Sequence, residues 1–99
     1  MPEGINFIPM EFEFDPDKNL ANQEKHGISF EDAQALWEDE DRLQIPAISE
    51  TEERFALLAS FRTKVWAAFF IYRGNAIRLI SVRRARTNEV ELYESGRTG

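Results

Sequence analysis

The sequence contains no cysteine and a single histidine, and only five glycines and four prolines occur among its 99 residues. Without cysteine there is no disulfide framework and no thiolate chemistry. No apolar run approaches the ~18 residues that a membrane-spanning helix needs. The acidic start MPEGINFIPMEFEF lacks the basic region of a signal peptide. We therefore expect a cytoplasmic protein that does not contact a membrane.

Several catalytic motifs are also missing. The sequence has no glycine-rich phosphate loop, no GxSxG turn and no zinc-ligand spacing. Hydrolysis of nucleoside triphosphates, serine hydrolysis and zinc hydrolysis therefore have no support. The acidic run EDED, Glu38 to Asp41, could attract a divalent cation, but metal ligands usually converge from several elements. We expect neither a metal nor another cofactor.

Basic residues are scarce in the first half of the chain. Residues 1–53 hold 3 Lys and Arg against 15 Asp and Glu, a balance of −12, whereas residues 54–99 hold 9 against 3, a balance of +6. An anion such as a phosphate backbone would meet the second half, and a basic partner the first. The alternative is that the two halves neutralise one another within the fold.

The residues that are present suffice for one globular domain. Hydrophobic residues make up 42% of the chain, with eight Phe and two Trp, and a chain of this length buries roughly 60–70% of its unfolded surface. We expect a single domain over residues 10–95, a flexible extension over residues 1–9 and a disordered tail over residues 96–99.

Periodicity and capping residues predict eight elements in the order β-α-α-β-β-β-β-α. Asp15 and Ser29 are natural helix N-caps, Pro16 suits a first helical position, and Gly27 suits a helix end. The predicted elements are a strand at 10–14, helices at 16–26 and 30–39, strands at 42–46, 54–61, 65–72 and 77–82, and a helix from a Thr87 cap to residue 95. The consecutive hairpins predict an antiparallel sheet with helices on one face, which is an α+β fold.

The last predicted strand runs directly into three arginines, Arg83, Arg84 and Arg86. Strict alternation places one set of side chains on one face of the sheet and a second set on the other. The first set is Ile77, Leu79, Ser81 and Arg83, and the second is Arg78, Ile80, Val82 and Arg84. The adjacent arginines at the end of the strand should therefore point to opposite faces.

Three strings in this order resemble the BrnT-type toxins: FEFDPDKNLANQEKHGISFEDAQALWED, EERF and RLISVRRARTNEVELYE. The likeness covers roughly Met10 to Glu94. It implies a RelE-like α+β fold, with two N-terminal helices and a short C-terminal helix packed on an antiparallel sheet. It also implies a type II toxin that cuts RNA and inhibits translation. The implied partner is a cognate antitoxin with a ribbon-helix-helix DNA-binding domain, in a heterotetramer.

Metal-free RNA cleavage requires a base, an acid and stabilisation of the charge on the phosphorane. Arginine suits the last role because its planar fork binds phosphate oxygens and stays charged. Arg83 and Arg84 are the first candidates for this clamp, and Arg54 can join them if its strand is close to the last one. The alternative is that these arginines pair with carboxylates, Arg54 with Glu52 or Glu53.

The proton-transfer candidates are weaker. His26 titrates near neutrality, but a histidine at a helix C-terminus commonly contacts the free carbonyls instead. Glu53 or Glu89 could act as a base, although acidic residues beside arginines more often form salt bridges. Lys25, Arg83, Arg84 and Arg86 are the candidate RNA contacts. Five aromatic residues could stack on bases, but most of them are expected to pack in the core, with an exposed Trp66 or Tyr72 as the exception: Trp37, Trp66, Phe69, Phe70 and Tyr72.

An alternative function is a RelE-like module that binds its partner without cutting RNA. The final helix, often very basic in the family, here carries Glu89, Glu91 and Glu94, which favours this alternative. Direct DNA binding is weaker still, because no predicted helix presents a basic recognition face.

Overall fold

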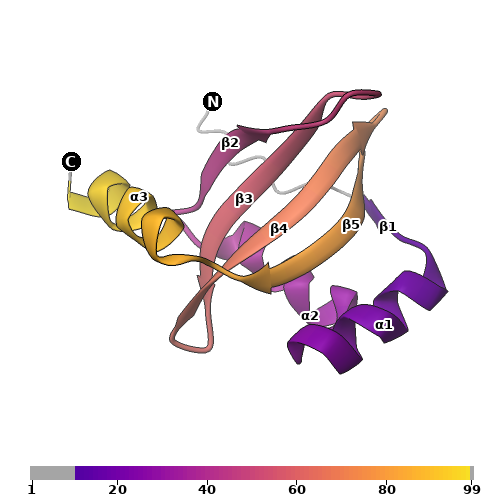
Figure 1. Ribbon diagram of the computed structural model, residues 1–99, viewed down its shortest axis with the longest axis horizontal. Helices are drawn as coiled ribbons and strands as arrows, with labels where there is room; N and C mark the ends of the chain where they lie inside the picture. The colour runs from indigo at the N-terminus through magenta and orange to yellow at the C-terminus, as the bar shows by residue number, and fades with distance from the viewer. Residues whose placement is uncertain (1–10, 99) are drawn as a thin grey trace.

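A five-stranded sheet in the order β1-β5-β4-β3-β2 forms the centre of the molecule (Figure 1). The computed structural model describes residues 11–98, so the predicted extension over residues 1–9 lies outside the described part. The elements are β1 (Glu11–Glu13), α1 (Pro16–His26), α2 (Phe30–Ala33), the 3₁₀ helix η1 (Gln34–Glu38), β2 (Leu43–Ala47), β3 (Arg54–Phe61), β4 (Lys64–Arg73), β5 (Ala76–Arg84) and α3 (Thr87–Thr98). The predicted α+β class is confirmed. None of the helices among residues 11–98 is long and apolar enough to cross a membrane.

Helix α1 begins and ends at the predicted residues, and α2 begins at its predicted residue. The Asp15 carboxylate accepts a hydrogen bond of 2.8 Å from the Asp17 amide, and Gly27 ends α1 with a φ of 77°. The Ser29 hydroxyl accepts one of 3.0 Å from the Asp32 amide at the start of α2. The second helix is α-helical for only one turn and continues as η1.

The sheet is mixed, because β1 lies parallel to β5 while strands β2 to β5 are antiparallel to their neighbours. Phe12 stands opposite Ile77 in the parallel pair. The prediction of a wholly antiparallel sheet followed from the hairpins, which fix the direction of β2 to β5 only. Strand β1 has no hairpin partner, and it joins the far edge of the sheet through a pairing between the two ends of the chain.

One extra residue in β5 changes which side chains share a face. Phe69 stands opposite Ser81 and Phe70 opposite Leu79, so Ile80 is a bulge. Val82 therefore packs in the same cluster as Ile77 and Leu79, and the predicted grouping of Ser81 and Arg83 with those two residues is wrong. The prediction that neighbouring arginines point to opposite faces is confirmed, because Arg83 lies over Phe69 and Arg84 over Trp66.

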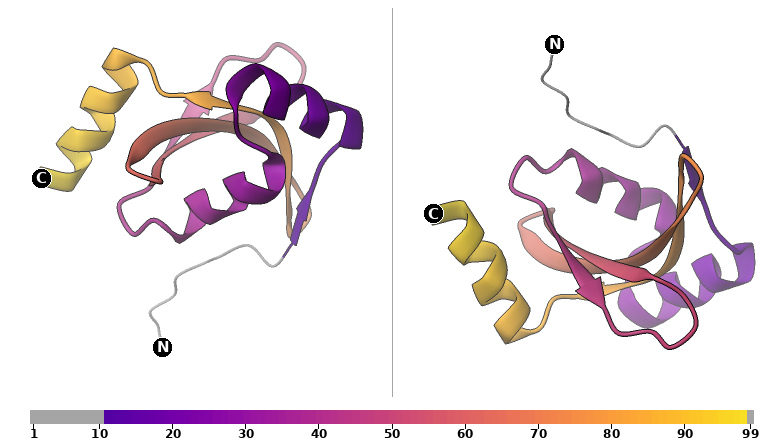
Figure 2. Two further views of the ribbon diagram at one scale, coloured as in Figure 1. Left: turned by 90° about the horizontal axis from the view of Figure 1, so that it is seen from below. Right: turned by 90° about the horizontal axis from the view of Figure 1, so that it is seen from above.

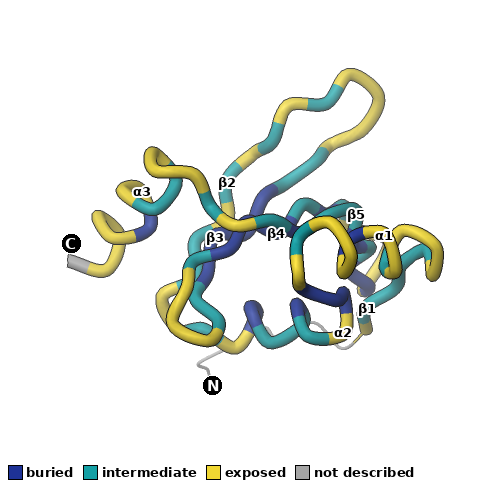
Figure 3. Tube along the Cα trace, turned by 60° about the horizontal axis from the view of Figure 1, so that its bottom comes forward, coloured by how far each residue is buried: buried dark blue, intermediate teal, exposed yellow. Residues whose placement is uncertain are grey.

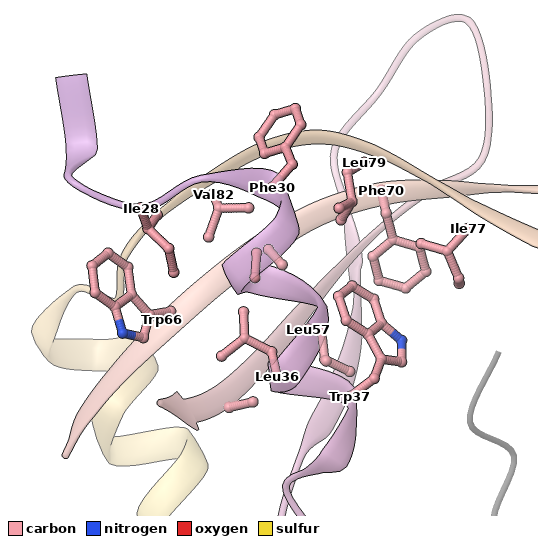
Figure 4. Packing of buried hydrophobic residues seen from close by; sticks show 13 residues of the cluster. Ile28, Phe30, Leu36, Trp37, Leu57, Trp66, Phe70, Ile77, Leu79 and Val82 are labelled. Carbon is pink, nitrogen blue, oxygen red and sulfur yellow. The ribbon is translucent and has the colours of Figure 1, made fainter. Parts of the chain in front are cut away.

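The main core fills the space between one face of the sheet and the segment of α2 and η1, with Ile28 just before it; we call this face the helical face (Figure 4). Trp37 of η1 packs edge-on against Phe70 of β4 with ring centroids 5.2 Å apart. Phe30 and Leu36 are completely buried beside them. Burial is concentrated here, whereas α1 exposes its outer surface (Figure 3). This packing fixes the sheet on which the remaining side chains are displayed.

Helix α3 packs against the opposite face, which we call the open face, and is set apart from α1 and α2 (Figure 2). The prediction of helices on one face is therefore wrong for α3. Its Tyr93 forms a small cluster with Leu58 and Ala67. The helix begins at Thr87 and runs to Thr98, so Thr87 is its first residue rather than its cap, and residues 96–98, predicted as part of a disordered tail, are helical.

Asn22 is a buried polar residue that joins α1 to the part of β5 that extends beyond its pairing with β1. Its side-chain oxygen accepts a hydrogen bond of 3.0 Å from the Val82 amide, and its side-chain nitrogen donates one of 3.0 Å to the Ile28 carbonyl. We expect Asn22→Ala to lower the free energy of unfolding by about 1–3 kcal/mol, because both backbone groups would lose their partner. Urea unfolding measures this. Gln23→Ala, an exposed amide on the same helix, should change stability by less than about 0.5 kcal/mol; equal effects would contradict the assignment.

Candidate functional site

Four side chains from four strands form a continuous row on the open face. Ile45 of β2 stands opposite Ala56 of β3, Ala56 opposite Phe69 of β4, and Phe69 opposite Ser81 of β5. We call these four residues the floor row. The next row toward α3 runs from Leu43 through Leu58 and Ala67 to Arg83, and Tyr93 packs on its centre.

The floor row is the base of an open depression of about 430 Å³. Its wall is apolar on the side of β2, where Ile48 just beyond the strand is 100% exposed. Its polar lining comes from Arg54, Ser81 and Glu89. The depression exists because α3 covers only the neighbouring row, and because Ala56 and Ser81 are small residues beside the larger Ile45 and Phe69.

Arg83 and Glu89 form a two-pronged ion pair at the edge of this depression. The two guanidinium nitrogens donate to the two carboxylate oxygens over 2.8 and 2.9 Å. The side chains are only 20% and 15% exposed. The guanidinium also lies 5.0 Å from the centre of the Phe69 ring. Strand β5 and the first turn of α3 therefore hold this cation in one orientation.

The pair shifts the protonation of both partners away from their ordinary values. The hydrogen bonds to Glu89 raise the pKa of Arg83. The hydrogen bonds from Arg83, together with that from the Arg86 amide, lower the pKa of the Glu89 carboxyl despite its partial burial. Glu89 is thus a carboxylate at neutral pH, able to accept a hydrogen bond but only weakly basic.

Arg54 reaches the same depression from β3. Its guanidinium donates to one oxygen of Glu52 over 2.7 and 3.1 Å, and the side chains of the pair are 34% and 37% exposed. Ion pairs this exposed contribute about 0–1 kcal/mol. A phosphate can therefore replace Glu52 at small cost, so Arg54 is available to an anionic ligand.

Arg84 lies on the helical face and not beside Arg83. Its guanidinium is 5.6 Å from the centre of the Trp66 ring, and the residue is exposed. Arg83 and Arg84 therefore do not face one phosphate together, which corrects the predicted clamp of these two residues. Arg54 from β3 lines the depression instead.

The other predicted site residues do not join the depression. His26 and Lys25 are the last residues of α1, just before Ile28 of the main core, and neither lines the depression. Glu53 is exposed just before β3. Arg86 precedes α3, where its backbone amide donates to Glu89 over 2.8 Å while its side chain is exposed.

In the acidic run at residues 38–41, Asp39 has a structural role. The Asp39 carboxylate accepts hydrogen bonds from the Ser60 amide, the Tyr93 hydroxyl and the Asp41 amide, over 2.8, 2.6 and 2.9 Å. It thereby joins η1, β3 and α3. Within residues 11–98, no three His, Asp or Glu side chains converge as a metal site.

Among the aromatic residues, the one that faces the depression is not one of the two exposed candidates. Trp66 is only 8% exposed and its ring nitrogen donates to the Phe61 carbonyl. Tyr72 is exposed, but it packs against Phe55 and Phe70. Phe69 lines the depression instead. The sequence pattern did not reveal the floor row, because its four members come from four strands and meet only through their register.

The arrangement can hold an anion and a neighbouring apolar group. Arg54 from β3 lines the depression, and Arg83 from β5 contacts two other lining residues, Phe69 and the Glu89 carboxylate with its lowered pKa. Arginine forks bind phosphate oxygens well. The geometry therefore fits chemistry on a phosphodiester.

Comparison with known proteins gives one clear result. No individually curated protein matches the chain significantly. The family model of BrnT, the ribonuclease toxin of type II toxin–antitoxin systems, matches residues 14–89. That range begins in the segment after β1, ends at Glu89, and includes Arg54 and Arg83. On this match, the protein belongs to the BrnT family of ribonuclease toxins of type II toxin–antitoxin systems.

Proposed function

We propose that this chain is an endoribonuclease that cleaves RNA on its open face without a metal ion, and thereby inhibits translation. The observation that carries the proposal is the placement of Arg54 and Arg83 on either side of one depression with Glu89 at its edge. Family membership supplies the class of reaction. The cytoplasm, where RNA is translated, is the compartment that this activity requires.

The arginines take the electrostatic part of the reaction. A pentavalent phosphorane carries more negative charge than the starting diester, so the arginine that contacts the scissile phosphate, Arg54 or Arg83, binds it more tightly than the substrate. Arg83 is held by Glu89 and by the Phe69 ring before any ligand arrives. Such preorganisation avoids the cost of orienting a flexible side chain during the reaction.

The groups at the depression that can take part in proton transfer are Glu89, Ser81 and water. His26, the only histidine of the sequence, ends α1 and is not among the residues that line the depression. Glu89 can accept a hydrogen bond from the attacking 2′-hydroxyl, which orients the nucleophile, but its lowered pKa makes it a weak base. The reaction therefore depends more on charge stabilisation and positioning than on a strong base.

The partner is a cognate antitoxin, as in the family's toxin–antitoxin pairs. We expect an antitoxin with a ribbon-helix-helix DNA-binding domain in a heterotetramer. The balance of −12 over residues 1–53 supports a basic contact segment on that partner.

A second candidate function is partner binding without cleavage. It is favoured by the pairing of every open-face arginine described above with a carboxylate, Arg83 with Glu89 and Arg54 with Glu52. A phosphate must displace or share these acids in order to bind. The two candidates predict opposite results in one experiment.

The test is induction of the protein alone in bacteria, followed by incubation of the purified protein with single-stranded RNA in EDTA. We expect growth arrest, RNA fragments in both settings, and relief of the arrest by co-expression of the cognate antitoxin. Intact RNA in both settings, with a stable antitoxin complex, would support the second candidate. Cleavage that stops in EDTA would overturn the metal-independent mechanism.

A further inference from the structure

The floor row has the shape and chemistry of a platform for a flat, largely apolar group. Phe69 offers an aromatic ring between the small side chains of Ala56 and Ser81. Ile45 and the fully exposed Ile48 form the wall beyond them.

Positive charge stands on both sides of this apolar row along the strand direction. On β3, Arg54 precedes Ala56 by two residues, and on β5, Arg83 follows Ser81 by two residues. Strands β3 and β5 run in the same direction, so the two arginines lie on opposite sides of the row. With about 3.3 Å per residue, the two rows that carry them are about 13 Å apart.

We infer that the floor row is a binding platform for one unstacked nucleobase of single-stranded RNA, with Arg54 and Arg83 contacting the phosphates on its two sides. This inference rests on the proposed function, because it assigns the base subsite of the same site. In an RNA strand each base lies between two phosphates, which matches an apolar platform between two cations. Aromatic and apolar platforms bind bases by stacking, without requiring a paired partner strand.

One polar group is free to contact the bound nucleotide. A carboxylate has about four acceptor positions, and three donors from the described residues use those of Glu89. Two of them, from Arg83 and the Arg86 amide, reach Oε1, and one from Arg83 reaches Oε2. Oε2 can therefore accept one more hydrogen bond, from a 2′-hydroxyl or an amino group, and Ser81 also lines the depression.

An apolar side chain of the antitoxin is the competing occupant. It would cover the apolar side chains of Ile45, Ile48 and Phe69. It would not contact the two flanking arginines or the free acceptor position of Glu89. A nucleotide uses the apolar row, the cations and the acceptor together. The charge pattern thus favours RNA.

The experiment compares 5′-nucleoside monophosphates with ribose 5-phosphate, by chemical-shift titration of wild type and Ala56→Leu. The added bulk points into the depression and leaves Arg54, Arg83 and Glu89 in place. Ala21→Leu, at an exposed position of α1, is the matched control. For wild type we expect at least one nucleotide to shift the amides of Ile45, Ala56, Phe69 and Ser81 and to bind at least about fivefold more tightly than ribose 5-phosphate. Ala56→Leu should lose this difference and Ala21→Leu should keep it.

Equal binding of ribose 5-phosphate and all nucleotides would overturn the inference and leave an anion site alone. Unchanged nucleotide binding by folded Ala56→Leu would also overturn it. So would loss of antitoxin binding by Ala56→Leu when wild type binds no nucleotide. Nucleotide binding on the platform by a protein that cuts no RNA would support the inference and refute the proposed cleavage. Unaltered cut positions in Ala56→Leu would overturn the inference and leave cleavage intact.

Discussion

Replacing Arg54 by alanine should lower the rate of RNA cleavage by about 10²-fold or more while leaving the fold intact. A donor aimed at the charge of the transition state contributes about 10²–10³ in rate, and misplacement of the substrate costs a similar factor. Arg54 has only an exposed ion pair with Glu52 to lose, so its removal costs little stability. Single-turnover cleavage of a labelled RNA measures the rate, and circular dichroism with thermal unfolding confirms the fold.

Arg83→Ala should reduce cleavage to a similar degree, but it also removes the partner of a carboxylate that is only 15% exposed. Arg83→Lys separates the two effects, because lysine keeps the charge but loses the two-pronged geometry; we expect partial recovery of stability and poor recovery of the rate. Arg62→Ala, at a side chain 74% exposed in the β3–β4 turn, is the control for loss of one positive charge. Arg84→Ala should resemble this control. Full activity of folded Arg54→Ala and Arg83→Lys would remove both arginines from the mechanism.

The hydrogen bond between Tyr93 and Asp39 should contribute measurably to the attachment of α3 to the sheet. Burial tends to raise the pKa of Asp39, but the hydrogen bonds from Tyr93, Ser60 and Asp41 lower it overall. Burial and the bond to Asp39 raise the pKa of Tyr93 to about 12. We expect Tyr93→Phe to lower the free energy of unfolding by about 1.5–3 kcal/mol near pH 7, measured by urea unfolding. Tyr72→Phe, at an exposed hydroxyl bonded to Gln44, should have a smaller effect.

The pH dependence follows from the direction of each shift. The pKa of Asp39 is lower in the folded state, so its contribution is present above its ordinary value of 3.8 and is lost as the pH falls through the folded value. The pKa of Tyr93 is raised, so its contribution is present below 10 and is lost as the pH rises through about 12. The difference between wild type and Tyr93→Phe should therefore be largest between these limits. A difference that does not change with pH would contradict the pair as its source.

Local sequence signals predicted the elements and missed their mutual arrangement. Asp15, Gly27 and Ser29 act through their nearest backbone neighbours, so the limits of α1 and the start of α2 follow from the sequence. The partner of β1 and the bulge at Ile80 depend on contacts between distant segments. Strict alternation fails at one inserted residue, and every side chain beyond it is then assigned to the wrong face.

The residues of the candidate site also separate into those that the sequence predicts and those that only the fold reveals. Arg54 and Arg83 can be predicted as candidates from their residue type and their positions at strand ends. The acidic residues nearby in the sequence also predict that these arginines form ion pairs. That Arg83 and not Arg84 lies on the open face follows from the bulge in β5, which the sequence does not reveal. The floor row can be identified only once the register of four strands is known. The position of α3 depends on the hydrogen bond between Tyr93 and Asp39, which are 54 residues apart in the sequence, so local patterns do not predict it.

The parallel pairing of β1 with β5 has a consequence for how the chain folds. Phe12 is among the first described residues to be synthesised, yet its partner Ile77 follows 65 residues later. Contacts of such long sequence separation require a costly loop closure and slow the folding of a domain. On a ribosome, β1 therefore waits in an unpaired state until β5 has emerged. The arginine of the candidate site on β5 and the helix that holds it are synthesised in that same final segment, so the chain acquires its complete sheet and its candidate site almost simultaneously.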